Sequence, residues 1–190
     1  MLLETFRQVV SRYPSALLVL APRHPERFEP VASLLESSGV RYQRRSQWDG
    51  LKPLAGGIFL LDSIGELASL YEFADLAFIG GSLVPRGGHN VLEAALFATP
   101  ILVGPHTENF RDSVERLRRN DALRVVTPQS LTATVLQLLE NDNERKALGR
   151  RAAEVARSQQ GATERTVSAL LELLAESAPV SAELSSERRA

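Results

Sequence analysis

The sequence contains no cysteine, and several other features are absent with it. Without cysteine the chain has neither a disulfide framework nor a cysteine-based zinc site. No apolar run approaches the roughly 18–20 residues that a membrane span needs. The first residues, MLLETFRQVVSRY, predict a helix rather than a signal peptide. We therefore expect a cytoplasmic protein.

The chain also lacks an excess of positive or negative charge. The chain has 22 Lys and Arg against 23 Asp and Glu, for a formal net charge of −1. A nucleic-acid surface is normally strongly basic, so we expect no nucleic-acid partner. With 190 residues, 44% of them hydrophobic, the chain is large enough to bury the core of one ordinary domain.

Four familiar site motifs are missing as well. The motif G-x-x-x-x-G-K-[ST] does not occur, which excludes a P-loop NTPase. A G-x-G-x-x-G loop after a strand, an H-E-x-x-H zinc motif and a G-x-S-x-G nucleophile elbow are also absent. The three histidines are scattered along the chain. We therefore expect no metal and no cofactor.

Short apolar runs alternate with helix-like patterns along much of the chain. Continuous apolar runs suit strands that are buried on both faces of a parallel sheet. The predicted strands are 16–22, 40–46, 57–63, 76–82, 100–105 and 123–128. The predicted helices between them are 25–38, 64–74, 90–98 and 108–120. This alternation predicts an α/β fold with a Rossmann-like, doubly wound parallel sheet.

After Pro128 the predicted strands stop. The predicted helices 130–140, 142–159 and 162–176 follow one another. The last residues, 177–190, are mostly small and polar, and we expect them to form a flexible tail. The sequence therefore predicts one domain over residues 1–176.

The loop after the first predicted strand carries a candidate anion clamp. In an open parallel sheet, ligands bind beyond the carboxyl ends of the strands. Arg23 and His24 come directly after strand 16–22. The planar guanidinium of an arginine in this place can hold a phosphate. The alternative is that both are surface side chains in a polar loop.

The loop after strand 57–63, LDSIGEL, has two interpretations. Ser63 and Glu66 have the spacing of a capping box, and capping of the next helix would explain both. Gly65 is unusual in the first turn of a predicted helix, because glycine weakens helices. A gap kept open for a close ligand would explain that glycine.

The most glycine-rich loop is GGSLVPRGGHN, residues 80–90. Gly87 and Gly88 turn the chain into a predicted helix that starts near Asn90. Backbone N–H groups at a helix start attract anions, and Glu93 can accept hydrogen bonds from sugar hydroxyls. The alternatives are that Asn90 only caps the helix and Glu93 only complements its dipole. In the next loop, GPHTENFRD, Thr107 is a candidate cap.

Three stretches together resemble the C-terminal half of the bacterial Kdo (3-deoxy-D-manno-octulosonic acid) transferases. They are PRHPERF (22–28), GELASLYEFADLAFIGGSLVPRGGHNVLEAA (65–95) and PILVGPHTENFRD (100–112), within a similarity over residues 6–170. The resemblance implies a glycosyltransferase of the GT-B fold, in which two Rossmann-like domains face a cleft. It implies transfer of Kdo from CMP-Kdo to lipid A precursor in lipopolysaccharide biosynthesis, with inversion and without a metal. The C-terminal domain holds the donor.

The resemblance also assigns roles to residues of the loops. It implies that Arg23 contacts the CMP moiety with His24 beside it. It implies that Gly65 and Glu66 line the nucleotide pocket through backbone and side chain.

The glycine-rich loop receives the largest share of these implied roles. The resemblance implies that the helix start is placed against the phosphate and the Kdo carboxylate by Gly87, Gly88, His89 and Asn90. It implies that Glu93 binds the ribose hydroxyls. The loop backbone would then be bare because an anionic sugar nucleotide lies against it.

The family's N-terminal domain has no counterpart in these residues. That domain binds the lipid acceptor and supplies the carboxylate that acts as general base. A general base must lie within hydrogen-bond reach of the proton that it removes, so we expect no transferase activity from this chain alone. For the intact enzyme the resemblance implies the cytoplasmic face of the inner membrane.

The first strand of the family's C-terminal domain is also without a counterpart. That strand is central in a sheet of order 3-2-1-4-5-6. We expect strands 16–22 and 57–63 either to flank a gap or to pair directly. A shortened gene, a split gene and an excised fragment would each explain the missing strand.

Two other hypotheses compete with a CMP-Kdo domain. The glycine-rich loop and Glu93 would equally serve a GT-B enzyme for a UDP-sugar or an ADP-sugar, although PRHPERF and GPHTENF favour CMP-Kdo. A non-catalytic module that pairs with a separate acceptor domain is the other hypothesis, because an open sheet edge invites pairing.

Overall fold

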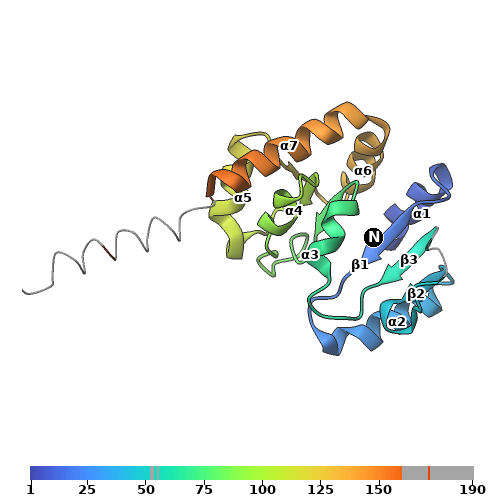
Figure 1. The fold of residues 1–190 in the computed structure, drawn as a ribbon. Helices are drawn as coiled ribbons and strands as arrows, with labels where there is room; N and C mark the ends of the chain where they lie inside the picture. The colour runs from blue at the N-terminus through green and yellow to red at the C-terminus, as the bar shows by residue number, and fades with distance from the viewer. Residues whose placement is uncertain (52–53, 55, 160–170, 172–190) are drawn as a thin grey trace, which may run out of the picture.

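The computed structural model describes residues 1–51, 54, 56–159 and 171. Within them the predicted alternation of strands and helices is confirmed (Figure 1). The α-helices are α1 (Leu2–Arg12), α2 (Phe28–Ser37), α3 (Leu67–Leu70), α4 (Leu92–Leu96), α5 (Arg111–Arg119), α6 (Leu131–Glu140) and α7 (Asp142–Gln159). Short 3-10 helices are η1 (Pro25–Arg27), η2 (Arg45–Gln47), η3 (Tyr71–Phe73) and η4 (Glu108–Phe110). The predicted helix 162–176, apart from Leu171, and the predicted tail 177–190 lie outside the described residues.

The strands form two parallel sheets. Their bounds are β1 (Leu17–Leu20), β2 (Tyr42–Arg44), β3 (Gly57–Leu60), β4 (Ala77–Ile79), β5 (Ile101–Val103) and β6 (Arg124–Val125). The first sheet has the order β1-β3-β2 and the second the order β4-β5-β6. Leu17 lies opposite Gly57 in the first sheet, and Ala77 lies opposite Ile101 in the second. Each predicted strand is thus present, and the parallel α/β class is confirmed.

The strands that were expected to flank a gap or pair directly, β1 and β3, pair directly. The break in the sheet lies instead between β1 and β4. β1 is the strand of its sheet nearest to the second half of the molecule, and the loops that follow β1 and β4 touch (Figure 1). In a sheet of order 3-2-1-4-5-6 this is the position of the central first strand. β1 is consequently less buried than a central strand, and Leu17 and Val19 are 37% and 36% exposed.

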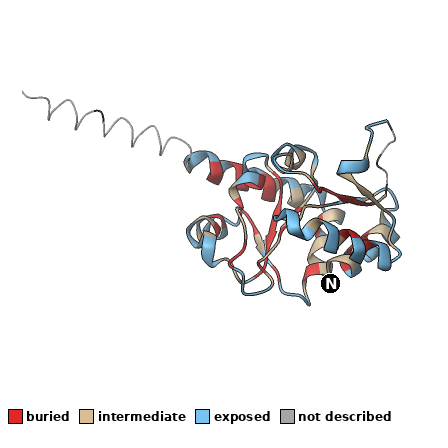
Figure 2. Cartoon of the chain, turned by 90° about the horizontal axis from the view of Figure 1, so that it is seen from below, coloured by how far each residue is buried: buried red, intermediate tan, exposed pale blue. Residues whose placement is uncertain are grey.

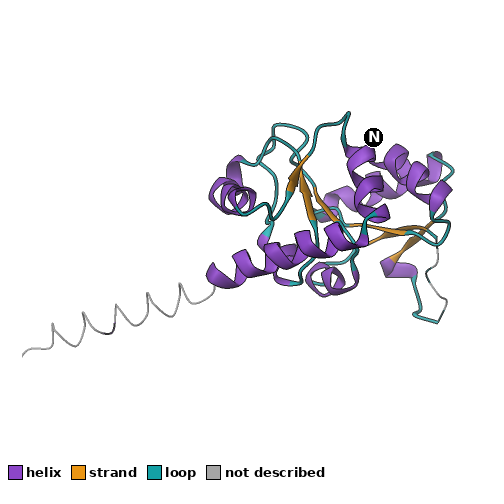
Figure 3. Cartoon of the chain, turned by 90° about the horizontal axis from the view of Figure 1, so that it is seen from above, coloured by secondary structure: helices purple, strands orange, loops and turns teal. Residues whose placement is uncertain are grey.

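Helices cover both sheets and join them. Figure 3 shows the strands in the middle of the molecule with helices around them, and Figure 2 shows that buried residues follow the strands in both halves. The second sheet packs against α4, α5 and α7. Helix α6 contributes Leu136 to the core beneath the first sheet and Leu138 to the core beneath the second. The hydroxyls of Thr5 and Thr132, 2.7 Å apart, link α1 to α6.

The topology decides where ligands can meet the chain. Because the strands of each sheet run parallel, the loops after β1 and β3 leave one edge of the first sheet, and the loops after β4 and β5 leave one edge of the second. The contact between Arg23 and His89 brings these two edges together. We call these four loops the loop edge. Among the described residues, no helix combines the length and the apolar character that crossing a membrane requires.

Candidate functional site

Two of the predicted site residues meet at the loop edge. Arg23 follows β1 and His89 follows β4, and Arg23 Nη1 lies 2.7 Å from His89 Nδ1. A guanidinium has only donors, so Arg23 donates this hydrogen bond and the imidazole accepts it. The contact joins the PRHPERF stretch to the GGSLVPRGGHN stretch, 66 residues apart. His24 makes a separate contact, with Nδ1 4.0 Å from Glu26.

The ring of His89 rests on the two glycines that end β4. A Cβ atom at Gly81 would lie 3.3 Å from His89 Nε2, and one at Gly80 would lie 3.9 Å from its Cδ2. Gly81 also has a φ of +69°, which favours glycine, and its carbonyl accepts from the N–H of Gly88 at 3.2 Å. These glycines therefore make room for the histidine ring.

Gly87 and Gly88 are buried against protein in this structure, and their predicted contact with the donor stays a prediction. A Cβ at Gly87 would lie 2.4 Å from Asn109 Nδ2, and one at Gly88 would lie 3.2 Å from the carbonyl of His106. The N–H of Asn109 donates to the Gly87 carbonyl at 3.1 Å, and its side-chain amide donates to the carbonyl of Arg86 at 3.3 Å. The two glycines thus let the loops after β4 and β5 pack together.

Asn90 precedes its helix instead of starting it, because α4 begins at Leu92. Asn90 Oδ1 accepts from the N–H of Leu92 at 3.0 Å, and Asn90 Nδ2 donates to Glu93 Oε1 at 3.0 Å. Burial and then the Glu93 carboxylate raise the pKa of the Tyr71 phenol. The carboxylate of Glu93 is therefore held as an acceptor by Asn90 and lies near enough to Tyr71 to act on its phenol.

Gly65 and Glu66 lie on a separate part of the loop edge. Gly65 has a φ of +89°, and a Cβ there would meet no atom within 4 Å. Helix α3 begins only at Leu67 and has no side-chain cap, so the predicted capping box and the placement of Gly65 in the first helical turn are both wrong. Because the backbone at Gly65 is left-handed, the helix can begin only after this residue. Glu66 instead accepts from Arg45 Nε at 2.8 Å.

A buried ion pair that the sequence analysis missed fixes this part of the edge. Asp62 follows β3 and accepts from Arg44 Nε at 2.7 Å, from the Ser46 N–H at 2.8 Å and from the Ser46 hydroxyl at 2.6 Å. Burial acts to raise the pKa of the Asp62 carboxyl, but the bonds from Ser46 and Arg44 outweigh it and hold the pKa below its usual range. The sequence signal for this ion pair is an aspartate directly after an apolar strand, together with the arginines of the neighbouring strand.

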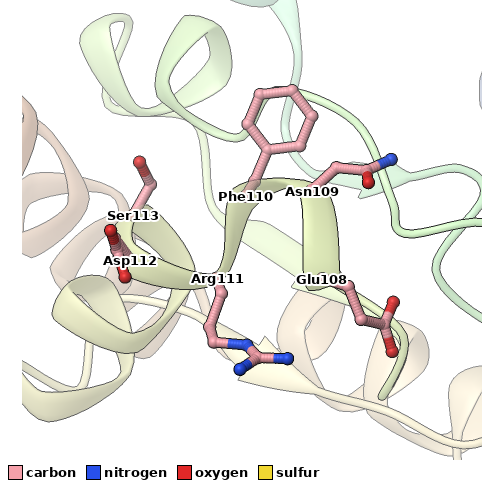
Figure 4. Close-up of a pocket in the computed structure, with 6 residues that line it drawn as sticks. All are labelled: Glu108, Asn109, Phe110, Arg111, Asp112 and Ser113. Carbon is pink, nitrogen blue, oxygen red and sulfur yellow. The ribbon is translucent and has the colours of Figure 1, made fainter.

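A hollow of about 440 Å³ opens where η4 meets α5. Its lining is polar apart from one ring, and Figure 4 shows Glu108 and Arg111 on one side of the turn and Phe110 on the other. Phe110 packs against the core of the second sheet. Thr107 makes no side-chain cap, so that prediction is also wrong.

The structure thus brings some of the predicted site residues together and leaves others apart. Arg23 contacts His89, and the next residue, Asn90, contacts Glu93 in the first turn of α4. Glu66 pairs with Arg45, and His24 with Glu26. In the described part of the chain, no three His, Asp or Glu side chains are grouped as a metal site requires.

Comparison with known proteins shows what the whole chain is similar to. No family model matches the chain. It is 39% identical over 175 residues to the 3-deoxy-D-manno-octulosonic acid transferase of Haemophilus influenzae, across 91% of this chain and 40% of the relative. It is 38% identical over 158 residues to the enzyme of the same name from Bordetella pertussis, across 83% of this chain and 37% of the relative. The chain therefore spans about two fifths of the length of these relatives.

A solved structure matches the fold as well. The crystal structure of the C-terminal CMP-Kdo binding domain of WaaA from Acinetobacter baumannii superposes with a TM-score of 0.74 at 30% identity, covering 80% of each chain. The parallel strands, the surrounding helices and the loop edge define the C-terminal domain of a GT-B glycosyltransferase. The chain belongs to the 3-deoxy-D-manno-octulosonic acid transferase family.

Proposed function

We propose that this chain binds CMP-Kdo at its loop edge and is the donor-binding part of a Kdo transferase of lipopolysaccharide biosynthesis. The contact between Arg23 and His89 carries the proposal, because it brings two of the stretches that resemble the family, PRHPERF and GGSLVPRGGHN, together at one place. The solved relative is a CMP-Kdo binding domain, which supports the same donor.

Each group at the edge has a task in this proposal. The guanidinium of Arg23 holds the donor phosphate by charged hydrogen bonds, with His24 beside it. The segment from Gly87 to Asn90 shapes the loop that faces the phosphate and the Kdo carboxylate. Glu93 accepts hydrogen bonds from the ribose hydroxyls and exchanges its bond from Asn90 for them. Gly65 and Glu66 border the nucleotide on the side of β3, and no metal or cofactor takes part.

The intact enzyme requires a second part to complete the reaction. We propose that the remainder of a full-length relative supplies the lipid A precursor site and the general base that takes the proton of the acceptor hydroxyl. The acceptor oxygen then forms the new bond to Kdo with inversion, and CMP leaves. A lipid acceptor puts the intact enzyme at the cytoplasmic face of the inner membrane, and this chain alone binds donor without transferring Kdo.

Pairing with a separate acceptor domain is supported by the open edges. Among the described residues, no strand pairs with the outer edge of β1, where Leu17 and Val19 are more than a third exposed, and Ile64 and Val84 are 77% and 49% exposed on the loops after β3 and β4. A partner that covered these side chains would bury apolar surface. In this second proposal the chain still contributes the donor site.

Calorimetry with CMP tests the proposed function. The folded chain should bind CMP, and UMP, UDP and ADP should compete more weakly. Arg23→Ala should weaken CMP binding about tenfold or more, the loss expected for a charged hydrogen bond. Arg27→Ala, an exposed arginine of the same stretch, is the matched control and should leave binding unchanged. A folded wild-type chain that binds no CMP would contradict the proposal, and stronger binding of a uridine or adenosine nucleotide would favour the other donors.

A further inference from the structure

The contact between Arg23 and His89 sets a condition on the charge of the imidazole. Arg23 Nη1 lies 2.7 Å from His89 Nδ1, which is hydrogen-bond distance. An arginine side chain has no acceptor and keeps its proton at all ordinary pH values. Nδ1 must therefore carry a lone pair, and the proton of a neutral His89 must be on Nε2.

The surroundings of His89 favour the neutral ring. Burial, followed by the charges of Arg23 and His24, holds the pKa of His89 below its usual range. Those two side chains are the charged groups that act on it. The opposite nitrogen, Nε2, lies against the backbone of Gly81, where a Cβ atom would be 3.3 Å away. The ring is thus confined between the guanidinium on one side and a glycine backbone on the other.

We propose that His89 is a positioning residue that holds Arg23 in place only while its imidazole is neutral, so that binding of an anionic nucleotide weakens on acidification. The inference rests on the proposed function, because the ligand is the donor that Arg23 binds. It gives His89 a role different from direct contact with the phosphate.

Protonation would convert an attraction into a repulsion. The added proton on Nδ1 would face the guanidinium, and two cations would stand where a hydrogen bond had been. Arg23 would lose its anchor, and its long side chain would regain rotamer freedom. Ligand binding would then have to order that side chain again, which costs free energy. Affinity for an anion falls even though the site has gained a positive charge.

Nuclear magnetic resonance of the histidine side chains tests the contact without any ligand. In the wild-type chain, the nitrogen shifts of His89 should show an unprotonated Nδ1 and a protonated Nε2. Arg23→Gln should raise the pKa of His89, because a nearby positive charge is removed. His106, whose Nδ1 lies 3.6 Å from Glu108, is the internal control, and its nitrogen shifts should be the same in both chains. A protonated Nδ1 at neutral pH, or an unchanged His89 titration in Arg23→Gln, would overturn the proposal.

Binding across pH tests the consequence. The ligand is the methyl phosphodiester of CMP, since its phosphate keeps one charge between about pH 5 and about pH 8, where histidine titrates. The wild-type dissociation constant should rise about tenfold toward the acid end, as expected for the loss of one charged hydrogen bond. His89→Gln should bind well without that pH dependence, because its amide oxygen accepts from Arg23 at every pH. His89→Ala should bind weakly throughout, and Arg27→Gln, at an exposed arginine outside the proposed site, should keep the wild-type profile.

The outcomes separate this inference from the proposed function. A folded wild-type chain that binds no CMP ester at any pH would sink the proposed function, and the ligand-free resonance experiment would still decide the role of His89. A wild-type chain that binds the ester with the same pH profile as His89→Gln would overturn the inference and leave the proposed function standing.

Discussion

Ser82 Oγ accepts a hydrogen bond from the backbone N–H of Gly104 at 2.8 Å, which ties the end of β4 to the end of β5. The same hydroxyl donates to the carbonyl of Ile79 at 2.5 Å, and Ser82 is fully buried. Its carbonyl accepts from the N–H of His106 at 2.9 Å. One serine therefore holds the two loops that form half of the proposed donor site.

Ser82→Ala should lower the free energy of unfolding by about 1–3 kcal/mol, because the buried N–H of Gly104 loses its acceptor. Chemical denaturation measures the change. Ser69→Ala is the matched control: the Ser69 hydroxyl is exposed and donates to the carbonyl of Glu66, so its removal should cost no more than about 0.5 kcal/mol. Equal losses in the two variants would contradict the role given to Ser82.

Gly87→Ala should destabilise the chain by about 1–3 kcal/mol, because its φ of +78° is strained for alanine and the new methyl group would collide with Asn109. Thermal or chemical unfolding measures the loss. Gly39→Ala has a φ of +67° and no neighbour within 4 Å, so it reports the backbone strain without the collision.

The collision has a second test. Asn109→Ala in the Gly87→Ala background should recover part of the loss, because it removes the side chain that the methyl group meets. If Gly87→Ala costs no more than Gly39→Ala, the packing of the two loops is not what requires glycine at position 87.

Much of the fold could be predicted because its determinants are local. The strand β5 is a continuous apolar run that ends at Gly104, and its neighbours follow the same pattern. Parallel strands also send their loops to one edge of a sheet, so the predicted parallel sheet already places the loops that carry Arg23 and His89 at the same edge. The position of these loops could therefore be predicted before any contact was known.

The contacts within those loops depend on distant residues and could not be predicted. Nothing near Gly87 in the sequence indicates that Asn109 packs against it. Arg44 ends β2 and Asp62 follows the neighbouring β3, and only the register of the two strands brings them together. Glycine was interpreted as space for a ligand, whereas the space at Gly81 is filled by the ring of His89.

Asp62→Asn should destabilise the chain by about 2–3 kcal/mol, because Arg44 loses a buried charged partner. Glu29→Gln removes the other partner of Arg44, but Glu29 is 75% exposed, so the expected loss is under about 1 kcal/mol. Denaturant titrations at neutral pH compare the two. A larger effect at Glu29 would show that the buried pair is not the stronger contact.

The low pKa of Asp62 also predicts that the free energy of unfolding falls in acid. Because the folded chain holds the pKa of Asp62 low, the unfolded chain binds this proton more readily. The stabilisation by Asp62 is complete above the ordinary aspartate value of about 3.9 and is lost as the pH falls through the folded value. Unfolding free energies measured across this range should fall less steeply for Asp62→Asn than for the wild type, and parallel curves would contradict this assignment.

Ala98→Gly should stabilise the chain by about 0.5–1 kcal/mol, because Ala98 has a φ of +56° just after α4, where glycine is unstrained. Ala98→Val should have the opposite effect, since a β-branched residue tolerates this conformation poorly. Melting temperatures provide the measurement. A loss of stability in Ala98→Gly would mean that the alanine methyl group contributes more than the strain costs.

Titration of CMP into isotope-labelled chain, followed by amide resonances, tests the central claim most directly. If the loop edge binds the donor, the largest shifts will fall on residues 23–24, 65–66 and 86–93, and α2 and β2 will serve as the unaffected reference. Shifts confined to residues outside the loop edge, or an unchanged spectrum of the folded chain at saturating CMP, would contradict the account.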